Sequence, residues 1–149
     1  MKRVIILSAL LLSGPAIASE QTDLVRQFYA PVTSEMEPSM RENFTGDARA
    51  RLDANDAMTE AGGEMGCIDF GLGIDAQDWD QEELDRTLKL TEEASEMTTQ
   101  VTARFTLFPG DASSGREIVW SLLNEGGAWR IEDISSVTNN WKLSEFDCN

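Results

Sequence analysis

Six acidic residues lie close together between Cys67 and Glu83, in the stretch CIDFGLGIDAQDWDQEE. Carboxylate oxygens are the ligands that calcium prefers, so this stretch is the first candidate for a metal site. An EF-hand-type calcium loop needs glycine at its sixth position and a carboxylate at its twelfth. A loop that starts at Asp78 has Glu83 and Lys89 at these positions, and a loop that starts at Asp75 also lacks both. The spacing therefore predicts no metal site.

The same acidic residues have structural roles open to them. An Asp side chain accepts hydrogen bonds from nearby backbone N–H groups, so Asp75 and Asp78 are expected to cap turns or helix starts. Asp80, Glu82 and Glu83 are expected to be exposed or to lie in the first turn of a short helix, where negative charge is favourable. The functional alternative is that these five residues form a binding surface for a basic protein.

The composition restricts acid–base catalysis. The chain contains no histidine, which excludes Ser–His and Cys–His mechanisms. Carboxylate chemistry stays open, because an Asp in an apolar cavity has a raised pKa and can act as a base. Tyr29, the only tyrosine, is a candidate oxyanion donor for such a site. The sequence assigns no cofactor to it.

Two aspartates lie in or beside predicted strands. Asp69 alternates with two apolar residues and is expected to point away from them. Asp133 shares parity with Trp129 and Ile131, so it is expected to point inward unless a break before Ile134 rotates it. Asp133 is therefore a candidate catalytic carboxylate. The alternative is a carboxylate at a strand end that accepts hydrogen bonds from backbone amides.

Aromatic residues fall on both the predicted helices and the predicted strands. Two roles are open: they line a pocket for a small apolar ligand, or they fill the core between helices and sheet, which is the commoner use of buried aromatic side chains. The candidate pocket residues are Phe28, Tyr29, Phe105, Trp120 and Trp129.

The first third of the chain predicts the helices that must position these residues. One is predicted from Thr22 to about Ala30, a short one begins at Pro38, and one runs from about Asp47 to Gly62. Pro31 ends the first helix and the Gly62–Gly63 pair ends the third. The predicted inward residues of the third helix are Ala48, Leu52 and Met58.

The rest of the chain alternates apolar and polar residues, which predicts half-buried antiparallel strands. The predicted strands cover a short segment at 68–70 and longer segments at 87–91, 101–108, 116–123 and 128–134. Ile134 breaks the alternation of the last one, which indicates a bulge or a strand end. Helices followed by a meander predict an α+β fold, with N-terminal helices packed on one face of a curved antiparallel sheet.

This order of elements resembles the nuclear transport factor 2-like superfamily. The resemblance covers most of residues 22–137 and rests on DLVRQFYAPV, then QDWD, then three alternating strands, then GGAWRIEDI. It implies a cone-shaped, cystatin-like α+β roll, and among the members are ketosteroid isomerase and polyketide cyclases. More narrowly, the chain looks like a group of exported bacterial proteins of unknown function. The resemblance carries no catalytic residue onto this chain, and it allows a homodimer.

The N-terminal segment predicts export. Residues 1–18 have a cationic start, an apolar run and an A-I-A end, which is typical of a secretory signal peptide cleaved after Ala18. Residues 19–149 then form one α+β domain of ordinary size, in a bacterial periplasm or secreted. Cys67 and Cys148 are expected to form a disulfide in that oxidising compartment.

The charge of the chain limits its partners. Its formal net charge is −15, and loss of Lys2 and Arg3 with the signal peptide gives 10 − 27 = −17. Nucleic acid and anionic membranes attract basic surfaces, so neither is an expected partner. No membrane anchor is predicted. A basic protein or a small apolar ligand fits better.

Three functions therefore stay open. The favoured one is an exported, non-catalytic binding or accessory protein. The second is a small enzyme of isomerase or dehydratase type with an apolar cone pocket. The third is an acidic inhibitor or immunity-type protein for a basic partner.

Overall fold

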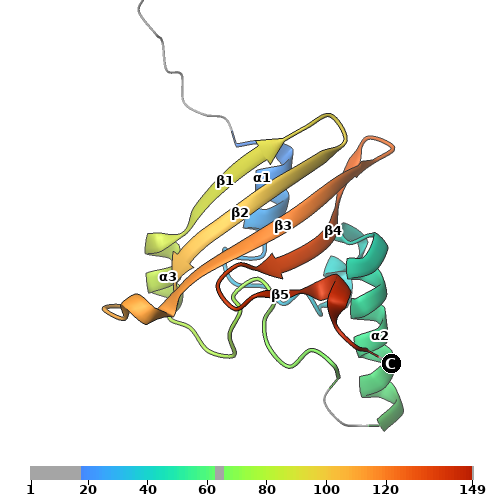
Figure 1. The fold of residues 1–149 in the computed structure, drawn as a ribbon, viewed down its shortest axis with the longest axis horizontal. Coiled ribbons are helices and arrows are strands. Elements are labelled where there is room, and N and C mark those ends of the chain that lie inside the picture. The colour runs from blue at the N-terminus through green and yellow to red at the C-terminus, as the bar shows by residue number, and fades with distance from the viewer. Residues whose placement is uncertain (1–17, 63–65, 149) are drawn as a thin grey trace, which may run out of the picture.

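An antiparallel sheet of five strands forms the centre of this computed structural model, which describes residues 18–62 and 66–148. The strands are β1 (Lys89–Ala94), β2 (Thr98–Thr106), β3 (Gly115–Glu125), β4 (Ala128–Ser136) and β5 (Trp141–Lys142). Each strand pairs with the next one along the chain. The sheet is curved and does not close on itself (Figure 1). The predicted signal peptide, apart from Ala18, lies outside the described residues.

Within the described residues, three α-helices and three short 3₁₀ helices accompany the sheet. They are α1 (Glu20–Arg26), η1 (Pro38–Asn43), α2 (Gly46–Gly62), α3 (Gln81–Thr87), η2 (Ala112–Ser114) and η3 (Leu143–Glu145). In Figure 1, α1 lies behind the sheet and α2 runs beside the edge that β4 and β5 form. This arrangement confirms the predicted α+β class. Among the described residues, no helix has the length and apolar character that a membrane span requires.

The alternation along the strands builds the core. In β3, Ile118, Trp120 and Leu122 are buried, while the residues between them are partly exposed. The same alternation buries Val101 and Phe105 on β2. Because α1 covers this side of the sheet, its apolar face and the inward strand residues share one hydrophobic core.

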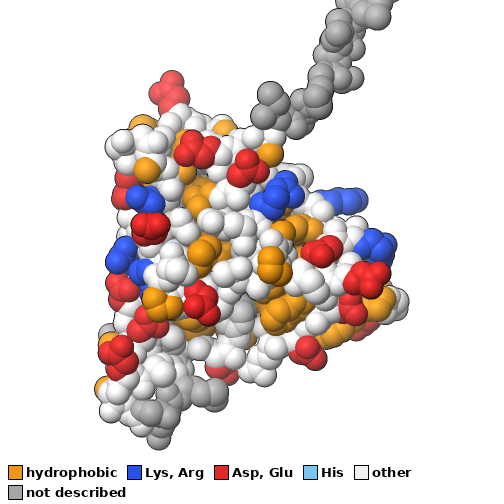
Figure 2. Space-filling model, turned by 180° about the vertical axis from the view of Figure 1, so that it is seen from behind, with side chains coloured by type: hydrophobic (Ala, Val, Ile, Leu, Met, Phe, Trp, Pro, Cys, Tyr) orange, Lys and Arg blue, Asp and Glu red, His pale blue; other side chains and the backbone are white. Residues whose placement is uncertain are grey.

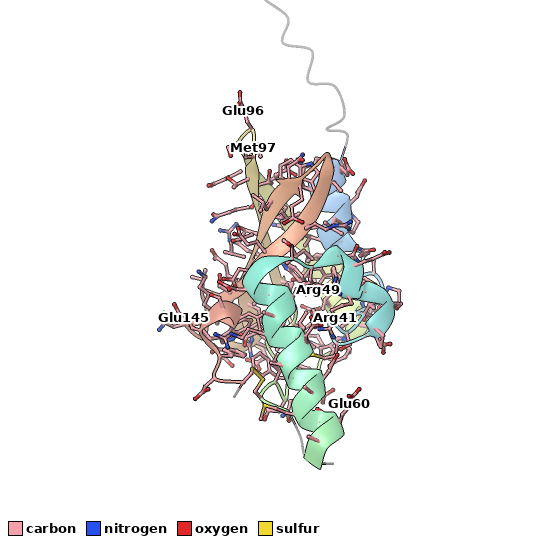
Figure 3. All side chains as sticks on the ribbon, turned by 90° about the vertical axis from the view of Figure 1, so that its right-hand side faces the viewer. Arg41, Arg49, Glu60, Glu96, Met97 and Glu145 are labelled. Carbon is pink, nitrogen blue, oxygen red and sulfur yellow. A yellow bond between two sulfur atoms is a disulfide. The ribbon has the colours of Figure 1, made fainter. Side chains whose placement is uncertain are left out.

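Two details of the predicted helices are wrong. The first helix ends at Arg26 instead of near Ala30, because the chain tightens there into hydrogen bonds between residues three apart, such as Phe28 N–H to Val25 C=O at 3.1 Å. Met58 is 36% exposed, although it was expected to point inward. Only the first part of α2 packs on the sheet, and its last turns project past it (Figures 1 and 3).

The predicted strand at 68–70 is also wrong. Segment 66–80 is a loop, and Ile68 pairs with none of the described strands. Its backbone N–H donates instead to Oδ1 of Asn55 on α2, at 2.9 Å. A local alternation of apolar residues was present, but a strand forms only where a neighbouring strand accepts its hydrogen bonds.

A β-bulge decides the orientation of Asp133. Ser121 pairs with Asp133 and Leu122 pairs with Ile131, so Glu132 is left without a partner on β3. Residues that face each other across a ladder share a side of the sheet, so Asp133 lies on the side of Ser121, opposite the core. This is the rotation that the break before Ile134 indicated. Asp133 there forms an ion pair of 3.2 Å with Lys142 and accepts the Ser144 N–H at 3.1 Å.

Candidate functional site

The acidic run Asp75–Glu83 does not form a continuous acidic surface. Asp78, Asp80 and Glu82 are exposed. Asp80 is the N-cap of α3 and accepts the Glu83 N–H at 2.8 Å. Glu83 is buried and bonds Arg86 at 2.6 Å, while Asp78 accepts the next backbone N–H along the chain. In residues 18–62 and 66–148, no group of three or more acidic or cysteine side chains is placed to hold a metal ion.

Asp75 is buried and ties its loop to the C-terminal part of the chain. Its Oδ2 accepts hydrogen bonds from Ser136 Oγ at 2.6 Å and Asn139 Nδ2 at 2.7 Å, and its Oδ1 accepts one from Trp141 Nε1 at 2.7 Å. The Arg116 guanidinium lies 4.0 Å away. Asp75 has a positive φ of 52°, a conformation that Asp tolerates better than most residues. Its carboxylate therefore serves the fold.

The candidate aromatic pocket is filled by its own side chains. Phe28 stacks on Trp120 with ring centroids 5.0 Å apart, and Tyr29 lies 5.5 Å from Phe105 and 6.0 Å from Trp120. These four side chains are 5% exposed or less. Trp129 lies outside the cluster and is partly exposed. The structure thus brings four of the five candidate pocket residues together, and these four form part of the hydrophobic core.

Tyr29 lies within this core and has no free position for an oxyanion donor role. Its hydroxyl donates to the Gly73 carbonyl at 2.8 Å and accepts from Trp120 Nε1 at 3.0 Å. Burial raises its pKa well above the ordinary value of 10.0. The bond to Gly73 connects the core to the loop that follows Asp69.

An open groove lies between two loops, at residues 32–37 and 68–79. Its volume is about 790 Å³. The apolar lining residues are Val32, Met36, Ile68, Phe70, Ile74, Ala76 and Trp79, and the carboxylates among the lining residues are Glu35, Glu37 and Asp69. Hydrophobic side chains also gather over the middle and lower part of the face shown in Figure 2, with acidic side chains around them. The sequence predicted neither this groove nor its two walls.

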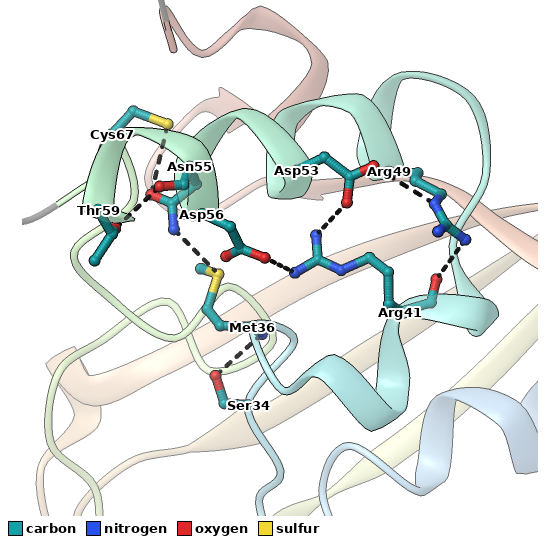
Figure 4. A network of polar contacts seen from close by, with 9 residues as sticks. All are labelled: Ser34, Met36, Arg41, Arg49, Asp53, Asn55, Asp56, Thr59 and Cys67. Carbon is teal, nitrogen blue, oxygen red and sulfur yellow. Dashed lines mark hydrogen bonds and ion pairs between the residues drawn. The ribbon is translucent and has the colours of Figure 1, made fainter. Parts of the chain in front are cut away.

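Helix α2 holds both walls of the groove. Asn55 accepts the Ile68 N–H on one wall, and its Nδ2 lies 3.8 Å from Sδ of Met36 on the other (Figure 4). Arg41 follows the wall at residues 32–37 along the chain. It is buried and donates hydrogen bonds to Asp53 at 3.2 Å and to Asp56 at 2.7 Å. Figure 3 shows Arg41 beside the N-terminal half of this helix, to which Arg49 belongs. Contacts with α2 therefore hold both walls of the groove in place.

The disulfide between Cys67 and Cys148 confirms the predicted pairing. It also joins the C-terminal tail to the start of the groove wall at residues 68–79. Phe70, three residues after Cys67, packs against Trp141 at 5.4 Å and Phe146 at 6.2 Å between ring centroids. The C-terminal tail is therefore fastened to the groove wall by a covalent bond and by an aromatic cluster.

Glu35 is the groove residue that sequence reasoning missed. It is 3% exposed, and its Oε1 accepts the Gly73 N–H at 2.7 Å. A Cβ atom at Gly73 would lie only 2.7 Å from that oxygen and 2.9 Å from Cζ2 of Trp120, so glycine allows this close approach. Burial raises the pKa of the Glu35 carboxyl above its ordinary value of 4.5, and the backbone hydrogen bonds offset this in part.

Stability is expected to fall as the pH rises through the raised pKa of Glu35. The folded state favours the neutral carboxyl, so its contribution is complete below pH 4.5 and is lost above the raised pKa. Glu35→Gln keeps an acceptor for the Gly73 N–H but cannot ionise. Urea unfolding should show that wild type loses more stability than this variant between about pH 4 and 8. An equal loss in both proteins would contradict the prediction.

Comparisons with models of known protein families, with curated proteins and with solved structures find no match to this chain.

Proposed function

We propose that this protein is an exported, non-catalytic binding module and that its site is the groove between residues 32–37 and 68–79. The volume of about 790 Å³ carries this proposal, because it lies in the range of roughly 300–1,000 Å³ of sites that take small organic molecules. Seven of the thirteen groove residues are apolar or aromatic, and the walls are fixed by α2 and the disulfide. A preformed apolar groove loses little conformational freedom when a ligand binds.

The ligand that fits is apolar and either neutral or positively charged. Among the residues that the structure describes, the groove is lined by three carboxylates and by no lysine or arginine. The whole chain carries a net charge of −15, so it repels anions that come within the electrostatic screening length of its surface. The proposed occupant is therefore a small apolar ligand. A basic side chain of a partner protein has the same combination of apolar body and positive charge and fits the same groove.

Export and superfamily membership belong to the same proposal. A disulfide persists in the periplasm or outside the cell and is rare in the cytosol, so the Cys67–Cys148 bond supports the compartment. Helices that precede an open, curved meander support a cone-shaped roll of the nuclear transport factor 2-like type. A homodimer through the uncovered side of the sheet is compatible with this architecture.

One observation favours the enzyme alternative. Glu35 is a buried carboxyl with a raised pKa at an apolar groove, which is the requirement for a general base in an isomerase or dehydratase. Its bond to Gly73 and its exposure of 3% favour binding over proton transfer. The inhibitor alternative needs a continuous acidic face, whereas Asp75 and Glu83 are turned inward.

Binding in the groove is tested with 1-octanol, a neutral apolar probe. Ala76 lines the groove, so Ala76→Phe fills it, while Ala57→Phe adds the same ring to an exposed position of α2. In wild type, octanol should shift the indole N–H resonance of Trp79 in ¹⁵N NMR spectra. We expect Ala76→Phe to weaken binding by about tenfold or more, as a blocked apolar site requires, and Ala57→Phe to leave it unchanged. No saturable shift in wild type, or equal binding by both variants, would refute the proposed site.

A further inference from the structure

Glu35 differs from every other buried carboxylate that the structure describes. Asp75, Glu83 and Asp133 each have a lysine or arginine nitrogen within 4.0 Å. Glu35 has no ion pair within residues 18–62 and 66–148, and it is the member of this set that lines the groove. An ionised carboxylate buried without a cation is costly, so such a group either pairs with a cation or raises its pKa and becomes neutral.

We propose that the groove binds an organic cation, an apolar body that carries a protonated amine, and that Glu35 provides its counter-charge. This inference rests on the proposed function and names its ligand class. An ammonium group donates up to three hydrogen bonds, and a carboxylate offers about four acceptor positions, of which the backbone N–H groups of Glu35, Leu72 and Gly73 take up to three. The apolar body then lies along the side chains of Ile74 and Trp79.

The desolvation of Glu35 makes its pairing with a cation stronger than pairing at the surface. Burial raises the pKa of Glu35 because the ionised form loses its hydration. A nearby cation offsets this loss of hydration free energy. Glu37 and Asp69 at the rim are exposed, so water and salt screen their attraction. They increase the rate of encounter, whereas Glu35 determines which ligand stays bound.

The rival role for Glu35 is a purely structural one, as an acceptor for the loop N–H of Gly73. Glu35→Gln separates the two roles, because glutamine keeps the acceptor oxygen and removes the charge. Glu37→Gln is the matched control, since it removes one charge from the rim of the same groove. The two probes are octylammonium and 1-octanol, which have the same apolar chain and differ in charge.

In wild type, octylammonium should bind about tenfold tighter than octanol, as expected for a charge pair shielded from water. Glu35→Gln should abolish this preference, so that the two probes bind the variant about equally. Glu37→Gln should retain most of the preference in about 0.5 M salt, where exposed charges are screened. If both probes bind wild type equally, or if Glu37→Gln abolishes the preference instead, the role of Glu35 is refuted while the groove stands. If neither probe binds, the proposed function itself fails.

A second measurement needs only the wild-type protein. A cation that pairs with Glu35 lowers its raised pKa, so amine binding should release protons and octanol binding should not. Calorimetry in buffers of different ionisation enthalpy counts these protons. Other groups near the ligand are Glu37 and Asp69 at the rim and Tyr29 beneath it, and the pKa of Tyr29 is far above the pH of the experiment. Octylammonium binding without proton release at every pH tested above 4.5, the ordinary value of this carboxyl, would overturn the inference.

Discussion

Replacing Asp75 with alanine is expected to lower the free energy of unfolding by about 3 kcal/mol or more. The carboxylate accepts three hydrogen bonds of 2.6–2.7 Å from Ser136, Asn139 and Trp141, which lie more than 60 residues away along the chain. Alanine leaves these donors without their acceptor and the Arg116 charge without its nearest carboxylate. Urea unfolding measures the loss.

Asp78→Ala is the matched control for that experiment. Asp78 lies in the same loop and carries the same charge, but it is exposed and accepts one hydrogen bond from the neighbouring Trp79 N–H. Loss of a single local cap costs about 1 kcal/mol or less at such a position. If both variants lost the same stability, the charge of the loop rather than the bonds of Asp75 would be responsible.

The sheet was predictable because its signal is local. Residues of β2 and β3 alternate between the core and the other side over nine and eleven residues, so the period of two is visible in the sequence. The bulge at Glu132 was also visible, as the break before Ile134. Both inferences depend on neighbours along the chain, and the structure confirms both.

The segment 66–80 was not predictable in the same way. Ile68 and Phe70 alternate as a strand does, but the hydrogen-bond partner of Ile68 is a side chain 13 residues earlier, on α2. The loop is then held by Asp75, whose partners come from β4 and the residues that follow it. A pattern in one segment does not report which distant side chain will satisfy its backbone.

The groove was missed for the same reason. Glu35 stands in the polar stretch TSEMEP, where nothing local distinguishes it from the exposed Glu37. Its partner Gly73 is 38 residues away, and the space that buries it is created by Trp120 and by the absence of a Cβ atom at Gly73. The aromatic residues that the sequence offered as pocket lining were conspicuous because of their size. Four of the five fill the core, where large side chains bury the most apolar area.

Loss of the disulfide is also expected to have a large effect on stability. The Cys67–Cys148 bond closes a loop across 81 residues of sequence separation, and such a loop restricts the unfolded chain by an amount worth about 4 kcal/mol at most. The double variant Cys67→Ser/Cys148→Ser should therefore melt up to roughly 15 °C below wild type. Calorimetry under non-reducing conditions measures the difference.

The control for this variant is the wild-type protein itself in a reducing agent. Reduction breaks the same bond without changing the sequence, so reduced wild type should unfold at the denaturant concentration that unfolds the double variant. Phe146 and Trp141 still pack on Phe70 in both proteins, so the tail should stay in place at low temperature while the fold becomes easier to unfold. Two free thiols in the unfolded, unreduced wild type, or a double variant as stable as the oxidised protein, would show that the bond does not stabilise the fold.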